Sequence, residues 1–287
     1  MGRAWARVAV AFLAPCLFAC VTQGDFRKLE ERVLDQGQRS ATRPNSGKQI
    51  AQLSAEVDAL REQQRKLSGE LEVAQKKADQ ALEEARKALE AACRTNPGHA
   101  PSHNNLADAL RKLGRLEDAA GHLRRAIEID PDYPLAHYNL GNVARLLDRP
   151  DEAKTHYQRA LARDPLYVKA RNNLGTTLAG LGRDREAVAA YRSVIEVDPE
   201  HAGARFNLAN ALLRLGEVDE AAQRYREVLQ DDPKDGDARF NLGRTYLRAE
   251  RFEAAAEAFG QVIESDPNDL EAQEGLELAR RALTNRD

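Results

Sequence analysis

Proline recurs every 34 residues through the last two thirds of this chain, at Pro97, Pro131, Pro165, Pro199, Pro233 and Pro267. An Asn-Leu pair keeps the same step, beginning at Asn105, Asn139, Asn173, Asn207 and Asn241. A fixed period of this size indicates a repeat architecture, in which each unit buries its apolar face only against its neighbours. The chain beyond about residue 100 is therefore expected to be a stack of copies of one unit.

Each unit has the pattern of two helices joined by a tight turn. In the second unit we expect helix A over residues 136–146 and helix B over residues 151–162. An Asp-Pro or Asn-Pro pair ends every helix B, because proline lacks an N–H and disfavours helix in the residue before it. Glycine suits the turn between the helices, because a positive φ costs it little. The turn positions of the five units are Gly114, Asp148, Gly182, Gly216 and Glu250.

We call the residues at equivalent positions of successive units a column. The columns of this repeat closely resemble those of the tetratricopeptide-repeat family over residues 100–269, which hold five units. The second half of each unit has an alanine, at Ala119, Ala153, Ala187, Ala221 and Ala255. A bulky residue follows, at Leu123, Tyr157, Tyr191, Tyr225 and Phe259. The resemblance implies an all-α solenoid of helical hairpins, a right-handed superhelix with a concave inner surface. One column departs from the family, with His103, His137, Arg171, Arg205 and Arg239. We expect the aliphatic or ring portions of these side chains to pack and their polar ends to reach solvent.

The first residues have the charge and length of a secretory signal. Two arginines precede a short apolar run that ends at Ala19, and Cys20 follows. This end resembles the lipobox of bacterial lipoproteins, which implies a signal peptide of residues 1–19 and palmitate or a similar acyl chain on Cys20. By the same resemblance Val21 favours the outer membrane, with the protein facing the periplasm. The alternative is an ordinary signal peptide with a chance cysteine.

Two segments separate this end from the repeats. Residues 20–47 are polar and are interpreted as a flexible tether. Residues 48–90 carry heptads, which predict a coiled coil and a homo-oligomer assembled through residues 48–78. The apolar positions are Ile50, Leu53, Val57, Leu60, Leu67 and Leu71, followed by a run of alanines. The order of parts resembles the periplasmic cell-division coordinator of the Tol–Pal system, whose coil is trimeric, whereas the heptad pattern favours a dimer. A solvated single helix is the alternative.

The ends of the solenoid need partial units. Residues 79–99 match the helix B pattern of an incomplete repeat, so that the coiled coil is expected to merge into the solenoid. Residues 270–287 predict a C-terminal capping helix, which such solenoids need for solubility.

A partner is expected in the concave groove. Resemblance to the family, and to the superhelix of the O-linked GlcNAc transferase, implies that the asparagine column faces inward. A carboxamide both donates and accepts, so Asn105, Asn139, Asn173, Asn207 and Asn241 could pair with an extended peptide backbone. Alternatively, these asparagines stabilise the stack. Nearby side chains that could add anchor pockets are Tyr138, Phe206, Phe240 and Arg244.

The sequence gives little support for catalytic activity, metal binding or nucleic-acid binding. No His/Cys cluster has metal-ligand spacing, and no phosphate loop or nucleophile elbow occurs. The formal net charge of −3 argues against nucleic acid. We therefore expect neither an enzyme nor a cofactor, but a lipid-anchored scaffold or adaptor for division, peptidoglycan or export proteins. The alternatives are a pilotin-like assembly factor for an outer-membrane complex and a structural oligomer without a groove ligand.

Overall fold

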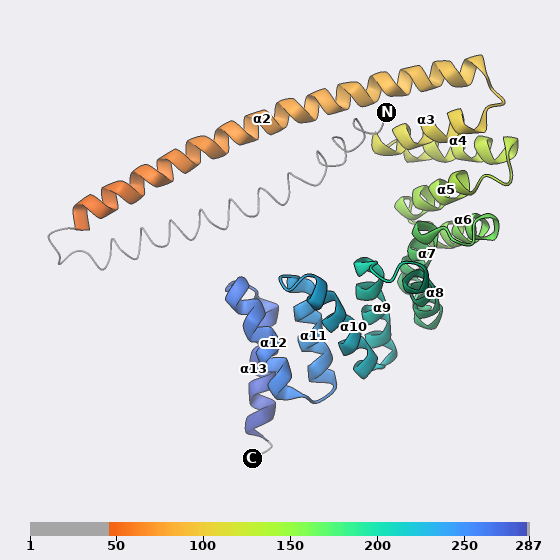
Figure 1. The fold of residues 1–287 in the computed structure, drawn as a ribbon. Coiled ribbons are helices and arrows are strands. Elements are labelled where there is room, and N and C mark those ends of the chain that lie inside the picture. The colour runs from red at the N-terminus through yellow and green to blue at the C-terminus, as the bar shows by residue number, and fades with distance from the viewer. Residues whose placement is uncertain (1–45, 286–287) are drawn as a thin grey trace. The chain divides into compact units, whose positions relative to one another are not determined.

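The computed structural model describes residues 46–285. The predicted signal peptide, the lipidation of Cys20 and all but the end of the tether lie outside the described residues. The described residues form helices and no strand, which confirms the all-α class (Figure 1). The helices are α2 (Ser46–Thr95), α3 (Ala100–Lys112), α4 (Leu116–Ile129), α5 (Pro134–Leu146), α6 (Pro150–Arg163), α7 (Val168–Gly180), α8 (Asp184–Val197), α9 (Ala202–Leu215), α10 (Val218–Asp231), α11 (Gly236–Arg248), α12 (Phe252–Ser265) and α13 (Leu270–Thr284).

Two units make up the chain, residues 1–88 and residues 89–287. In the first unit, most of α2 is a single helix that shows apolar side chains to solvent. Leu60 and Leu67 are each 43% exposed and Leu71 is 40% exposed. Buried heptad positions are what a coiled coil requires, so this exposure is what one strand without its partner would show. The oligomer itself stays a prediction. No described helix is both long and apolar enough to span a membrane.

The second unit begins within α2. From Leu89 onward this helix packs on the first repeat, where Leu89 and Cys93 join the cluster formed by Ala100, Leu106 and Leu123. Cys93 is buried, and this burial raises the pKa of its thiol, with Glu90 adding to the effect. The last turns of α2 therefore cover the apolar end of the solenoid.

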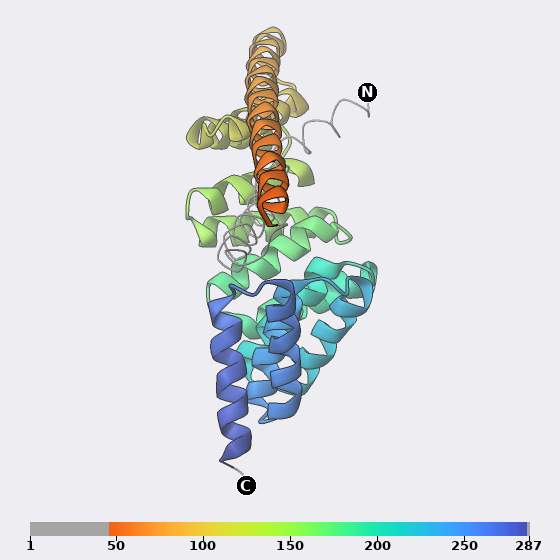
Figure 2. The ribbon, with the colours of Figure 1, turned by 90° about the vertical axis from the view of Figure 1, so that its left-hand side faces the viewer.

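Five helical hairpins follow one another in chain order, with α3, α5, α7, α9 and α11 as helices A. The helix axes turn progressively along the stack (Figures 1 and 2). Each helix A closely approaches the helix A of the next repeat, and α11 approaches α13 in the same way. No comparable approach joins one helix B to the next in the described part of the chain. Because the inner side of a curved stack is the shorter one, the helices A form the concave face.

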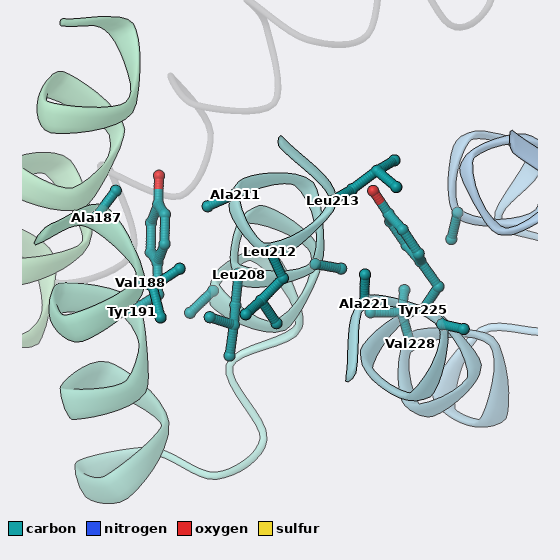
Figure 3. Packing of buried hydrophobic residues seen from close by; sticks show 14 of the residues in the cluster. Ala187, Val188, Tyr191, Leu208, Ala211, Leu212, Leu213, Ala221, Tyr225 and Val228 are labelled. Carbon is teal, nitrogen blue, oxygen red and sulfur yellow. The ribbon is translucent and has the colours of Figure 1, made fainter. Parts of the chain in front are cut away.

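In the second to fifth hairpins, the core is an aromatic ring of helix B held against a small residue of helix A, whereas Leu123 takes the place of the ring in the first. Tyr191 and Tyr225 are buried on either side of Leu208 and Leu212, as Figure 3 shows. A methyl group added at Gly141 would lie 2.6 Å from the Tyr157 ring, and one at Gly175 would lie 2.7 Å from the Tyr191 ring. The small residue after the Asn-Leu pair is therefore required by the close approach of helix B.

All five turns between helices A and B adopt a positive φ. Glycine provides it in three of them, with φ between 71° and 83°. Asp148 and Glu250 adopt the same conformation with φ of 57° and 55°. This region costs a residue with a side chain about 1–2 kcal/mol, so these two turns are strained by the shape that the repeat imposes.

For the two histidines of this column, the rings pack as expected, but the prediction that their polar ends reach solvent was wrong. His103 and His137 are only 7% and 3% exposed. In each, Nε2 lies 3.2 Å from a proline carbonyl oxygen and Nδ1 lies 3.1 Å from Nδ1 of a second histidine, His122 or His156. Since Nε2 must donate to the carbonyl, Nδ1 accepts from the second histidine. In the same column, Arg171 and Arg239 donate to Pro165 and Pro233 carbonyl oxygens.

These histidine pairs predict that the first two repeats lose stability in acid. Burial, and then the paired histidine, lower the pKa of His122 and lower that of His156 to about 4. Burial likewise lowers the pKa of His137. The unfolded chain, with a histidine pKa of about 6.5, therefore binds more protons between about pH 6.5 and 4, and stability falls across that window as the pH falls. The other charges acting on the pairs are Glu90, Arg115, Asp118, Arg124, Asp132, Glu152, Arg159 and Arg163.

The measurement is the midpoint of thermal unfolding between pH 7.5 and 5, above most carboxylate titrations. The wild type should lose more stability over this range than the variant His122→Gln/His156→Gln. Replacing exposed His99 in the same way should leave the slope unchanged. Equal slopes in all three proteins would contradict the assignment.

Candidate functional site

The asparagine column lies along the concave face but is not uniform. In the second and third repeats its carboxamides link each helix A to the helix A before it. Asn139 Nδ2 donates to Asn104 Oδ1 at 2.8 Å, and Asn173 Nδ2 donates to Asn142 Oδ1 at 2.9 Å. Asn142 Oδ1 also accepts from the buried Tyr157 hydroxyl at 2.8 Å. These bonds tie the N-terminal part of the stack together.

Further along the column the carboxamides are not used in this way. Asn241 Nδ2 donates to the carbonyl oxygen of Asp237 on its own helix at 3.0 Å. Asn207 has no hydrogen-bond partner among the described residues, although Asn172 holds the place that Asn104 holds for Asn139. Asn172 Oδ1 is itself buried without a partner. Apart from the exposed Asn105, the carboxamides that no neighbouring helix uses, and that could pair with a peptide backbone, therefore lie in the C-terminal half of the column.

Aromatic side chains beside the column explain the same division. The Tyr138 ring packs against Tyr157 of its own repeat, at 6.1 Å between centroids, and against Tyr167 of the next, at 4.8 Å. Burial, and then Tyr138, raise the pKa of Tyr167 to about 12. Tyr167 thus fills the concave face beside Tyr138. Two and three repeats later its position is held by Asp235 and Asp269, whose short side chains leave space.

That space forms two pockets of equivalent composition in consecutive repeats. The first, which we call the Phe206 pocket, lies between α9 and α11 and has a volume of about 250 Å³. It is lined by Ala202, Gly203, Phe206, Asn207, Val228, Asp235 and Asp237. Each lining residue has its counterpart 34 positions later, and all seven counterparts line the second, the Phe240 pocket.

The Phe240 pocket lies between α11 and α13 and is larger, at about 820 Å³. It is lined by Gly236, Asp237, Arg239, Phe240, Asn241, Arg244, Val262, Ser265, Asp266, Asn268, Asp269, Leu270 and Glu271. Both phenylalanines are held edge-on by a buried ring of helix B, Phe206 by Tyr225 and Phe240 by Phe259. The Arg244 guanidinium lies 6.0 Å from the centre of the Phe240 ring. We call the two pockets together the C-terminal groove.

The residues predicted for a groove therefore fall into two groups. Asn139, Asn173 and Tyr138 lie where side chains already occupy or cross-link the concave face. Asn105 belongs to neither group, because it is exposed and accepts only from Asn104 Nδ2 of its own helix, at 3.4 Å. Phe206, Asn207, Phe240, Asn241 and Arg244 line the C-terminal groove. In the described residues, no group of three or more His, Cys, Asp or Glu side chains is placed to hold a metal ion.

Sequence reasoning missed the acidic and small residues of the groove. Asp237 and Glu271 stand in the first turns of α11 and α13, and Gly203 and Gly236 line the two pockets. The signal was present as a change between repeats, from tyrosine at Tyr167 to aspartate at Asp235 and Asp269. Such a change can be interpreted only when the residues at one repeat position are compared with the residues of the next repeat that they contact.

Comparison of the sequence with models of protein families identifies the repeats. A model described as tetratricopeptide repeat matches residues 173–236, 206–269 and 240–283, and a second with that description matches residues 132–200. A model described as TPR repeat matches residues 107–144. The chain belongs to the tetratricopeptide-repeat (TPR) family. Proteins of this family are generally interaction scaffolds without catalysis. No match was found among curated proteins.

Solved TPR structures resemble the chain over its repeats. YrrB, described as a TPR protein with an unusual peptide-binding site, is 28% identical with a TM-score of 0.63, covering 67% of this chain and 100% of YrrB. MamA of Desulfovibrio magneticus is 21% identical with a TM-score of 0.56, over 59% of this chain and 97% of its own. PilF of Pseudomonas aeruginosa is 22% identical with a TM-score of 0.58, over 68% and 88%. The last two show the fold alone.

Proposed function

We propose that this TPR protein is a lipid-anchored scaffold at the bacterial cell envelope that holds an extended segment of a partner protein in the C-terminal groove. The observation that carries the binding role is the pair of equivalent pockets, each lined by a phenylalanine and the asparagine that follows it. YrrB, a similar TPR fold described as having an unusual peptide-binding site, supports the same role.

An extended segment suits this groove for a geometric reason. The two pockets repeat along the concave face at the interval of the repeats, and an extended chain presents side chains at regular intervals on one face. Asn207 has a free carboxamide at the first pocket, which can pair with both the N–H and the C=O of a backbone. The pockets would then hold side chains while the asparagine orients the main chain.

The anchor and the envelope location are part of this proposal and rest on the sequence. Cys20 at the end of a short apolar run resembles a lipidated cysteine, and Val21 favours the outer membrane, with the solenoid in the periplasm. A single acyl chain binds membranes weakly, so the proposal requires several on Cys20. The exposed leucines of α2 support a homo-oligomer, a dimer or trimer formed through residues 48–78.

One experiment tests both parts of the proposal, namely chemical crosslinking in intact cells followed by fractionation and affinity capture. The groove is closed by Gly203→Trp/Gly236→Trp, because an added methyl group at either glycine meets no neighbour closer than 3.5 Å, so that a side chain can start there without displacing packed atoms. The matched control is Gly121→Trp/Gly260→Trp on helices B, where nothing lies within 4 Å of an added methyl group. The wild type and the control should capture the same partner from the membrane fraction.

The closed-groove variant should lose that partner, while its circular dichroism stays unchanged. Cys20→Ser should keep the partner but move the complex to the soluble fraction. A partner retained in full by the closed-groove variant would refute groove binding, and Cys20→Ser still attached to the membrane would refute the lipid anchor.

A further inference from the structure

The charges around the C-terminal groove are of one dominant sign. Asp235 and Asp237 border the Phe206 pocket, and no cationic side chain lines it. The Phe240 pocket is bordered by four carboxylates and two arginines, Asp237, Asp266, Asp269 and Glu271 against Arg239 and Arg244. None of these carboxylates forms an ion pair with another described residue. Their negative charges are therefore available to attract a cationic group of a ligand in the pockets.

The two arginines offset two of the four carboxylate charges of the Phe240 pocket, so that the carboxylates remain in excess there. Arg239 donates to the carbonyl oxygen of Pro233, and that bond holds its guanidinium at the Asp-Pro turn. Arg244 lies over the face of Phe240, where it can donate to a carbonyl oxygen of a bound main chain. Asp237 and Glu271, in contrast, are exposed at the first turns of α11 and α13.

Asp235 and Asp269 also cap helices, so they are not suitable positions for testing the charge of the groove by substitution. Each caps its helix by accepting a backbone hydrogen bond, from Ala238 N at 2.8 Å and from Ala272 N at 2.9 Å. Losing either cap would weaken the fold as well as the charge of the groove. The side chains of Asp237 and Glu271 have no such role among the described hydrogen bonds, so their charge can be changed with less effect on the fold.

We propose that the C-terminal groove selects a segment in which two apolar side chains are flanked by lysine or arginine. The apolar side chains enter the Phe206 and Phe240 pockets, and the cationic ones face Asp237 and Glu271. This inference rests on the proposed function and specifies its partner by chemistry. Like charges would repel an acidic segment from the same pockets, so the acidic border discriminates as well as attracts.

The test uses a phage-displayed library of random dodecapeptides selected on the full chain at low ionic strength. Peptides that bind the wild type but not Gly203→Trp/Gly236→Trp should be enriched in pairs of apolar residues next to lysine or arginine. One enriched peptide is then synthesised with a fluorescent label, and its affinity is measured by anisotropy.

Charge reversal by Asp237→Lys/Glu271→Lys should weaken this peptide about ten-fold or more, and Asp237→Asn/Glu271→Gln by an intermediate amount. The control Glu196→Lys/Glu257→Lys makes the same change of net charge on exposed positions of helices B and should leave the affinity nearly unchanged. Groove-dependent peptides that are neutral or acidic, or an equal loss in the control, would overturn the inference while leaving groove binding intact. A selection that yields no groove-dependent peptide would count against the proposed function itself.

Discussion

Replacing Tyr157 with alanine should destabilise the solenoid by about 3–5 kcal/mol, the usual cost of deleting a large buried aromatic side chain. The ring is completely buried, and it lies so close to Gly141 that no side chain fits between the two helices. Its hydroxyl donates to Asn142 Oδ1, the same atom that accepts from Asn173 of the next repeat. Alanine would therefore leave a cavity within one hairpin and weaken its link to the following one.

Thermal unfolding followed by circular dichroism measures this effect. For a chain of this size the midpoint should fall by an amount on the order of 10 °C. The matched variant Tyr157→Phe keeps the ring and removes only the hydroxyl, so its cost should be about 1 kcal/mol. If alanine and phenylalanine proved equally costly, the packing against Gly141 would not be the main contribution of this residue.

Removing residues 48–78 should convert an oligomer into a folded monomer. This part of α2 belongs to the first unit, while Leu89 and Cys93, which pack on the first repeat, belong to the second. Leu60, Leu67 and Leu71 lie on one heptad seam and are each about two-fifths exposed in the single chain. Burying such a seam against a second copy provides the free energy for association.

Light scattering of the purified protein tests the deletion, with circular dichroism as the check on the repeats. The mass should fall from that of a dimer or trimer to that of one chain, with the helix signal of the solenoid retained. A matched change, Leu60→Ser/Leu67→Ser, should have the same effect without shortening the chain, whereas Glu62→Gln/Glu72→Gln on exposed positions of the same helix should not. A deleted protein that keeps its oligomeric mass would place assembly in the solenoid.

The hairpins could be predicted from the sequence because their determinants are local or periodic. Proline at Pro131 and Pro165 marks the helix ends, and the turn at Asp148 follows from the repeat even without glycine. The structure gives α5 and α6 within two residues of the ranges expected for the second unit. Each of these features is determined by the residues at one position of the repeat, independently of the neighbouring repeats.

The division of the concave face could not be predicted in this way. Whether an asparagine is free depends on residues 31 or 35 positions earlier, as the bonds from Asn173 to Asn142 and from Asn139 to Asn104 show. The histidine pairs join residues 19 positions apart, on the two helices of one hairpin. A column that looks uniform in sequence thus has two roles, because its neighbours in space change from repeat to repeat.

Site-specific photocrosslinking in intact cells tests the central claim most directly. Benzoylphenylalanine would replace Asn207 in the C-terminal groove, Glu196 on the outer face of α8, or Leu67 on α2, one position at a time. We expect a crosslink to a partner protein from position 207, none from 196, and a crosslink to a second copy of the chain from 67. A partner captured from position 196 but not from 207 would contradict the claim that the concave face is the binding site.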